Sequence, residues 1–151
     1  MSGPLVDFFN MQRPRVSFPP CQDMGTREWG SEELLVHAPG KYTLKRIFIK
    51  QGCKGGLQYH HLKDEAAFIL SGTLKLLVES RDGELEEKIV SSGEWFHIPA
   101  LSVHQEIAVT DVIILEVSTP YFNDRVRVEE HFGEPAEGGL LSTTIDQISF
   151  S

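Results

Sequence analysis

The stretch Gln58-Tyr59-His60-His61-Leu62-Lys63-Asp64-Glu65 carries the densest chemical information in this chain. Side chains two residues apart on a β-strand project from the same face, so Gln58 and His60 face together. Glu65 follows across a short turn, and His104 lies beyond a second segment that glycine and proline interrupt. An amide oxygen, a carboxylate and two imidazoles that converge on one point form a mixed N/O site for a divalent metal. The sequence therefore predicts that Gln58, His60, Glu65 and His104 bind one metal ion.

The adjacent histidines His60 and His61 cannot both point into a barrel from a regular strand. We expect His60 to be the ligand and His61 to be a surface or subunit-contact residue. The mixed donor set accommodates Zn, Mn, Fe, Co or Ni, so the sequence does not choose between these metals.

The bulk composition indicates one globular domain. The chain has 151 residues, of which 40% are hydrophobic and 24% charged, with a formal charge of −8. This negative charge argues against a nucleic-acid partner, because no basic stripe is present to neutralise phosphates. No apolar run approaches the ~20 residues that span a bilayer, and no signal pattern opens the chain, so we expect no membrane partner and a cytoplasmic location. In that compartment Cys21 and Cys53 are expected to be reduced thiols.

Short β-strand patterns recur along the middle of the chain. Turn residues separate them, among them the Asp82-Gly83 pair, which is a strong hairpin signal. Such spacing predicts an all-β sandwich or barrel. The expected strands cover residues 42–49, 57–61, 66–70, 73–79, 88–90, 95–98, 105–109 and 112–117.

The two ends of the chain differ from this middle region. Residues 1–28 are expected to form an irregular, extended arm, because prolines interrupt any helix or central strand. Residues 29–133 would form the barrel, and within them residues 125–132 could form a short helical turn. Residues 134–151 would form a loop-like tail, in which residues 142–150 could add an edge strand.

Two motifs in the chain resemble those of the cupin superfamily, G-x5-H-x-H-x3–4-E-x6-G and G-x5-P-x-G-x2-H-x3-N. The chain departs from them at three positions: Gln58 replaces the first histidine, Leu101 the glycine and Ala108 the asparagine. The resemblance implies a double-stranded β-helix, a jelly-roll-like barrel that holds one metal in its mouth. The chain itself reads Gly52-x5-Gln58-x-His60-x4-Glu65-x6-Gly72 and then Gly93-x5-Pro99-x4-His104.

A narrower resemblance is to small type II mannose-6-phosphate isomerase-like cupins. Their Leu-Gln-x-His-x4-Glu segment and later histidine match Leu57–His60, Glu65 and His104 here. This resemblance implies a metal-dependent enzyme that isomerises a sugar or sugar phosphate, with the metal as Lewis acid. It also implies a small carbohydrate substrate and a homodimer formed by exchange of N-terminal strands.

The chain departs from the isomerase pattern beside the predicted ligands. Ala66 and Ala67 follow Glu65 where those enzymes have His-Trp, and Val103 and Gln105 flank His104 where they have Lys and Arg. The missing cations are plausible holders of a phosphate or an enediolate. Their loss favours a different substrate over drift in an enzyme with the same substrate.

Three further residues are weaker candidates. His97 could donate a proton in the cavity, although a structural histidine is the more common state. Arg127 matches an arginine of the isomerase pattern and could bind an anionic group, or could form a surface salt bridge. Lys63 is a substrate-binding candidate, against the usual rule that lysines near strands are solvated.

Two other functions compete with an isomerase. Two histidines and a carboxylate suit a non-haem iron dioxygenase, although Gln58 would occupy a position that oxygen needs. The uncharged neighbours of His104 would suit a non-catalytic carbohydrate-binding or regulatory cupin.

Overall fold

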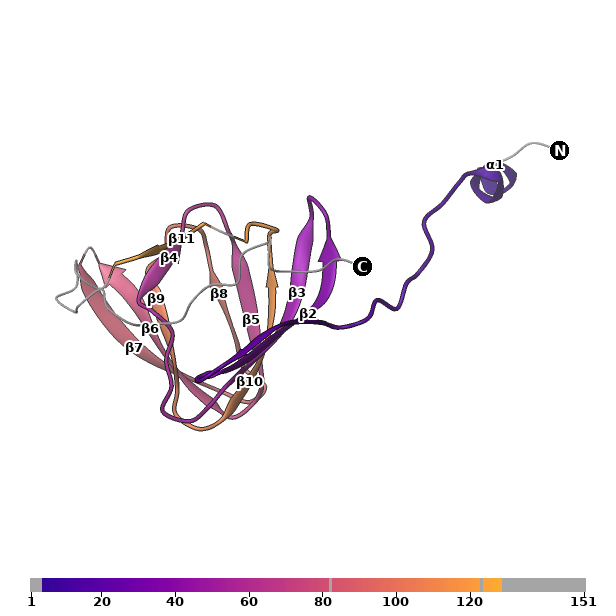
Figure 1. Ribbon diagram of the computed structural model, residues 1–151. Helices are drawn as coiled ribbons and strands as arrows, with labels where there is room; N and C mark the ends of the chain where they lie inside the picture. Colours follow the sequence, from indigo (N-terminus) through magenta and orange to yellow (C-terminus); the bar gives the residue numbers. More distant parts are fainter. Residues whose placement is uncertain (1–3, 82, 123, 129–151) are drawn as a thin grey trace.

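The computed structural model describes residues 4–81, 83–122 and 124–128 of the chain. This part is almost entirely β-structure, with one short helix at its start (Figure 1). The elements are α1 (Pro4–Asn10), β1 (Gln22–Arg27), β2 (Gly30–Ala38), β3 (Tyr42–Ile49), β4 (Gln58–His60), β5 (Glu65–Ser71), β6 (Thr73–Arg81), β7 (Glu84–Ser91), β8 (Trp95–Ile98), β9 (His104–Ala108), β10 (Val112–Ser118) and β11 (Arg125–Arg127).

The strands form two antiparallel sheets that face each other as a barrel (Figure 1). One sheet has the order β1-β2-β3-β10-β5-β8 and the other β11-β4-β9-β6-β7. Strands adjacent in space are often distant in sequence: β10 pairs with both β3 and β5, and β9 pairs with both β4 and β6. This arrangement confirms the predicted all-β barrel.

Alternate side chains along each strand point into the barrel and fill its interior. On β10, for example, Val112 and Ile114 are fully buried and Glu116 and Ser118 continue the same inward face. Apolar inward residues therefore form a core at one end of the barrel, and polar inward residues gather toward the other. The core cluster consists of Trp29, Ile47, Ile49, Ala67, Ile69, Leu74, Leu76, Val90, Ile98, Ala108, Val112 and Ile114.

The N-terminal region is more ordered than predicted. The expectation of irregular structure throughout residues 1–28 is wrong, because α1 lies there and β1 pairs with β2 at the edge of the larger sheet. The prolines lie outside both elements or at the start of α1, where a missing N–H is tolerated. Only the connection between α1 and β1 is the extended arm that was expected, and it leads away from the barrel (Figure 1).

The C-terminal prediction was partly wrong. Instead of a helical turn, Arg125–Arg127 forms β11, which pairs with β4, the strand that carries Gln58 and His60. A free edge on β4 provides backbone partners for an extended segment, and these outweigh a weak helical pattern. The tail at 134–151, with its expected edge strand, lies outside the described residues.

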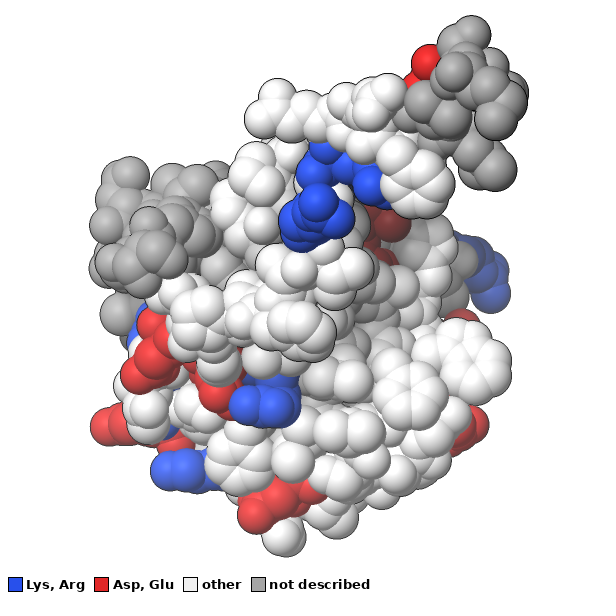
Figure 2. Space-filling view, turned by 90° about the vertical axis from the view of Figure 1, so that its right-hand side faces the viewer, with Lys and Arg blue, Asp and Glu red and all other residues white. Residues whose placement is uncertain are grey.

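The state of the two cysteines and the distribution of basic side chains can be compared with what the composition predicted. Cys21 and Cys53 are free thiols. On the face that Figure 2 shows, lysine and arginine side chains form separate groups rather than a continuous band. In the described part of the chain, no helix has the length and apolar character needed to cross a membrane.

Leu101 adopts a left-handed backbone conformation, with φ of 71°, at the position where the cupin motif has glycine. Its amide donates a hydrogen bond to the His60 carbonyl at 2.8 Å, so this turn joins the strand that carries a predicted ligand. A left-handed conformation costs an L-residue roughly 1–2 kcal/mol, and the Leu101 side chain is 60% exposed.

We therefore predict that Leu101→Gly raises the free energy of unfolding by about 0.5–1 kcal/mol, since relief of strain exceeds the entropy cost of glycine. Chemical denaturation measures the change. The matched control is Ala100→Gly, which relieves no strain and should lower stability slightly. A Leu101→Gly protein less stable than the Ala100→Gly protein would contradict the prediction.

Candidate metal centre

Three of the predicted ligands lie together inside the barrel. His60, Glu65 and His104 are 9%, 4% and 3% exposed, and their ligand atoms all lie within 4.8 Å of one another. The Glu65 Oε1 atom is 3.2 Å from His104 Nε2 and 3.9 Å from His60 Nε2. Donors about 2.1 Å from a common ion are roughly 3–4 Å apart, so this geometry fits a divalent metal.

Gln58 supplies the fourth donor that the sequence predicts. Its strand β4 places it directly opposite His104 on β9, so the two side chains share the inward face. The Gln58 Oε1 atom is buried and has no hydrogen-bond partner in the described part of the chain. A buried acceptor without a donor is costly, and a cation at this position would satisfy it. The residues present therefore fit a metal ion.

Both histidines are held with Nε2 facing the carboxylate. The His104 Nδ1 atom bonds the Ser102 carbonyl oxygen at 2.9 Å, and the His60 Nδ1 atom bonds Asp124 Oδ1 at 3.1 Å. A hydrogen bond from Nδ1 leaves Nε2 with the lone pair that a metal needs. Asp124 also accepts bonds from the backbone amides of Leu62 and Lys63, at 2.7 and 2.6 Å, and so fixes the loop between the ligands.

The two carboxylate oxygens of Glu65 have different partners, because Lys63 contacts only one of them. Its ammonium lies 3.1 Å from Glu65 Oε2 and 3.1 Å from Glu116 Oε1, and the residue is 8% exposed. The other oxygen, Oε1, is the one that faces both histidines. Lys63 is therefore not solvated as lysines near strands usually are: it is a buried partner of a predicted ligand, and it also lines the cavity.

The pKa shifts follow from this burial and charge. Burial, together with the Lys63 charge, lowers the pKa of His60 to about 4, which leaves it neutral at pH 7. Burial also acts against the charged form of His104, but the Glu65 carboxylate outweighs it and raises the pKa of His104. Burial of Glu65 is similarly outweighed, chiefly by Lys63, so the pKa of Glu65 lies well below its usual value. The centre thus offers an anionic carboxylate and a neutral imidazole.

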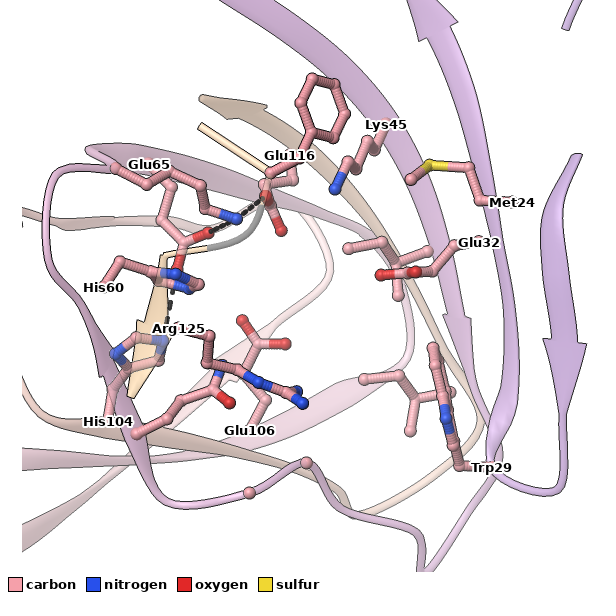
Figure 3. A pocket seen from close by; sticks show the side chains of 17 residues that line it. Met24, Trp29, Glu32, Lys45, His60, Glu65, His104, Glu106, Glu116 and Arg125 are labelled. Atoms are coloured by element: carbon pink, nitrogen blue, oxygen red, sulfur yellow. Dashed lines mark hydrogen bonds and ion pairs between the residues drawn. The ribbon is translucent and has the colours of Figure 1, made fainter. Parts of the chain in front are cut away.

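A cavity of about 110 Å³ extends from these residues across the open end of the barrel. Its wall near the centre includes Glu106 and Glu116, its opposite wall includes Trp29 and Glu32, and Lys45 lies between Glu116 and Glu32 (Figure 3). The lining is largely polar, as expected for a small hydrophilic ligand. Apolar contacts come from Met24, Ile47, Ile49 and Phe122.

Glu106 is a cavity carboxyl that the sequence reading missed. It follows His104 by two residues on β9 and therefore points the same way. Its carboxylate makes no hydrogen bond or ion pair with the described residues. Burial, together with the charges of Glu65 and Glu116, raises the pKa of Glu106 to about 8.

Two of the three weaker candidates, His97 and Arg127, do not line the cavity. His97 is exposed on β8 and its Nε2 atom bonds Asp64 Oδ1 at 2.9 Å, so the structure gives it a surface contact and no place in the cavity lining. Arg127 shares the inward side of β11 but is absent from the lining, whereas Arg125, two residues earlier, lines the cavity.

The departures from the isomerase pattern also lie outside the cavity. Ala66 pairs with His97 on the outer side of the sheet, while Ala67 is part of the core. Val103 and Gln105 are buried but do not line the cavity, and Gln105 donates a hydrogen bond to the Gly55 carbonyl oxygen at 2.7 Å. The uncharged neighbours of His104 therefore say little about what the cavity binds.

The adjacent histidines provide a matched test of the centre. We predict that His60→Ala lowers the stoichiometry of bound divalent metal at least tenfold, because one of four donors and its orientation by Asp124 are lost. His61→Ala, which removes an exposed imidazole one residue away, should leave the metal content unchanged. Elemental analysis of both purified proteins measures the difference. Equal metal content in the two variants would show that His60 is not a metal ligand.

Comparison with known families gives a match over most of the described chain. Residues 21–130 match the family model described as "Mannose-6-phosphate isomerase C-terminal". The Alginate biosynthesis protein AlgA of Pseudomonas aeruginosa is 32% identical over 120 residues, which cover 76% of this chain and 24% of that protein. A Mannose-1-phosphate guanylyltransferase of Salmonella muenchen is 30% identical over 112 residues, 71% of this chain and 22% of the relative. The chain thus spans about a quarter of the length of these relatives.

Solved structures with low sequence identity share the fold. The capsular polysaccharide assembling protein CapF of Staphylococcus aureus has a TM-score of 0.64 at 21% identity, covering 72% of this chain and 32% of CapF. KdgF of a Halomonas species has a TM-score of 0.55 at 19% identity, covering 62% of this chain and 81% of KdgF. An RmlC-like cupin of Shewanella frigidimarina has a TM-score of 0.52 at 17% identity, covering 62% and 78%. The chain is therefore a cupin and belongs to the mannose-6-phosphate isomerase C-terminal family.

Proposed function

We propose that this cupin is a divalent-metal-dependent isomerase of a sugar or sugar phosphate. The observation that carries this proposal is the set of buried His60, Glu65 and His104 with Gln58, whose Oε1 atom is buried, on the wall of a polar cavity. The Glu106 carboxyl, which has no partner among the described residues, lies on the same wall. The family relationship supports a carbohydrate substrate, because the relatives' names concern mannose phosphates and alginate.

The four donors would hold the metal, and the ion would polarise the substrate carbonyl as a Lewis acid. Lys63 keeps Glu65 Oε2 occupied, so that Oε1 alone is directed at the ion. Gln58, His60, Glu65 and His104 would each supply one donor atom to the metal.

Glu106 is the side chain we propose for proton transfer. Its carboxylate would take the proton from C2 of an aldose, and the resulting acid would return that proton to C1. The proton of the C2 hydroxyl moves to the C1 oxygen, so an aldose becomes a ketose with no gain or loss of atoms. The position of Glu106 between the metal centre and the far wall suits a substrate that lies across the cavity (Figure 3).

Turnover tests this proposal. We predict metal-dependent interconversion of mannose and fructose or of their 6-phosphates, abolished by a chelator and restored by added metal. Glu106→Gln should lower kcat by about 10²–10⁴-fold and leave the metal content unchanged, because it removes the proton carrier and no ligand. A coupled assay gives the rates. Absence of turnover with all four substrates would sink the isomerase, and oxygen uptake by the iron-loaded protein would point to a dioxygenase instead.

We also propose a homodimer in which the N-terminal arm packs on a second copy. The arm and α1 expose several large apolar side chains, and such groups are normally covered in solution. They are Phe8, Phe9, Met11, Val16 and Phe18. Light scattering should give twice the 17.0 kDa chain mass, and deletion of residues 1–19 should lower it. A monomeric full-length chain at high concentration would contradict this.

A further inference from the structure

The cavity continues well beyond the metal centre to a second polar wall. Glu32 on β2 lies opposite Ile47 on β3, and Lys45 lies two residues before Ile47, so these side chains share the inner face. Trp29 precedes β2 and lines the same side of the cavity. In Figure 3 Trp29 and Glu32 lie across the cavity from His60, Glu65 and His104, and Lys45 lies between Glu116 and Glu32.

Trp29 carries a hydrogen-bond donor without an acceptor. The residue is 7% exposed, and its Nε1 atom is buried and has no partner in the described part of the chain. An indole nitrogen can only donate a hydrogen bond, so it needs an acceptor, and no described residue supplies one to Trp29. Buried polar groups of native proteins nearly always have partners, which makes a ligand oxygen or water the natural acceptor.

The neighbouring charges restrict which ligand oxygen can serve. The Glu32 carboxylate makes no hydrogen bond or ion pair with the described residues, and the Lys45 ammonium lies over the Phe122 ring, 5.5 Å from its centre. A hydroxyl group can accept from Trp29 and donate to Glu32 at once. A phosphate dianion cannot donate to Glu32, and the Glu32 carboxylate would repel it.

We propose that Trp29, Glu32 and Lys45 form a hydroxyl-binding subsite for the end of the substrate that lies away from the metal. The substrate is then a neutral, unphosphorylated sugar whose carbonyl end lies at the metal centre. The position of the carbonyl end rests on the proposed function, but the subsite itself does not. The rival arrangement is a phosphate held by Lys45 and Arg125, the two cavity cations outside the Lys63 ion pairs.

A polyol that cannot react separates these readings. D-mannitol has the hydroxyl groups of a six-carbon sugar but no carbonyl, so its binding is independent of turnover. D-mannitol 1-phosphate is the matched anionic probe. The chain has two tryptophans, and Trp95 is 75% exposed on the outside, so Trp95→Phe leaves Trp29 as the only indole reporter.

We expect D-mannitol to change the fluorescence of the Trp95→Phe protein and not that of the Trp29→Phe protein. By calorimetry, Glu32→Gln should weaken D-mannitol binding about tenfold or more, because a bond to a charged acceptor is lost. Trp29→Phe should weaken it about threefold to tenfold, and Trp95→Phe not at all. Thermal unfolding confirms that each variant is folded, and Glu32→Gln carries the test if Trp29→Phe is not.

Unchanged D-mannitol affinity in Glu32→Gln would overturn the subsite. So would tighter binding of D-mannitol 1-phosphate than of D-mannitol, with loss of that preference in Lys45→Met. If D-mannitol binds as expected but no sugar is isomerised, the subsite stands and the proposed reaction fails. If sugars are isomerised with unchanged KM in Glu32→Gln, the reaction stands and the subsite fails.

Discussion

The buried Glu65 carboxylate is the group on which the centre depends. One of its oxygens faces two imidazoles and the other contacts the Lys63 ammonium, which also contacts Glu116. Removal of one partner from a buried ion pair costs about 3–5 kcal/mol, because a charge is then left without compensation inside the protein. The loop that carries Lys63 is fixed by Asp124, so the position of the ligand, its counter-charge and the orientation of His60 are linked.

This linkage explains why the barrel is polar at one end. Inward-facing positions of β9 and β10 carry His104, Glu106 and Glu116 where an ordinary core would have apolar residues. Four glutamates line the cavity, and among the described lysines and arginines Lys63 forms ion pairs with two of them, Glu65 and Glu116. These carboxyl groups suit a cation at the centre and hydroxyl groups elsewhere, which connects the proposed metal with the proposed neutral substrate.

Strand alternation made the fold and part of the centre predictable. Glycine-punctuated strands were located within a few residues, and parity separated the inward His60 from the exposed His61. The same parity applied to His104 and Val112 would have identified Glu106 and Glu116 as inward carboxylates, so these were available from the sequence. β2 was missed because Glu32 and Glu33 interrupt its apolar pattern, and β11 because only pairing with β4 makes it a strand.

The sequence by itself determined the cupin barrel, the inward faces of its strands and the identity of four candidate metal ligands, because these depend on local alternation and short spacing. Only the tertiary structure decided that Asp124 orients His60, that Lys63 is buried between Glu65 and Glu116, and that His97 lies outside. These contacts join residues distant along the chain or depend on how a loop folds back, and no local pattern encodes such distances. The pairing of neighbouring strands β2 and β3 places Glu32 and Lys45 on one inner face, and the barrel brings that face, with Trp29, to the same cavity as the candidate metal centre.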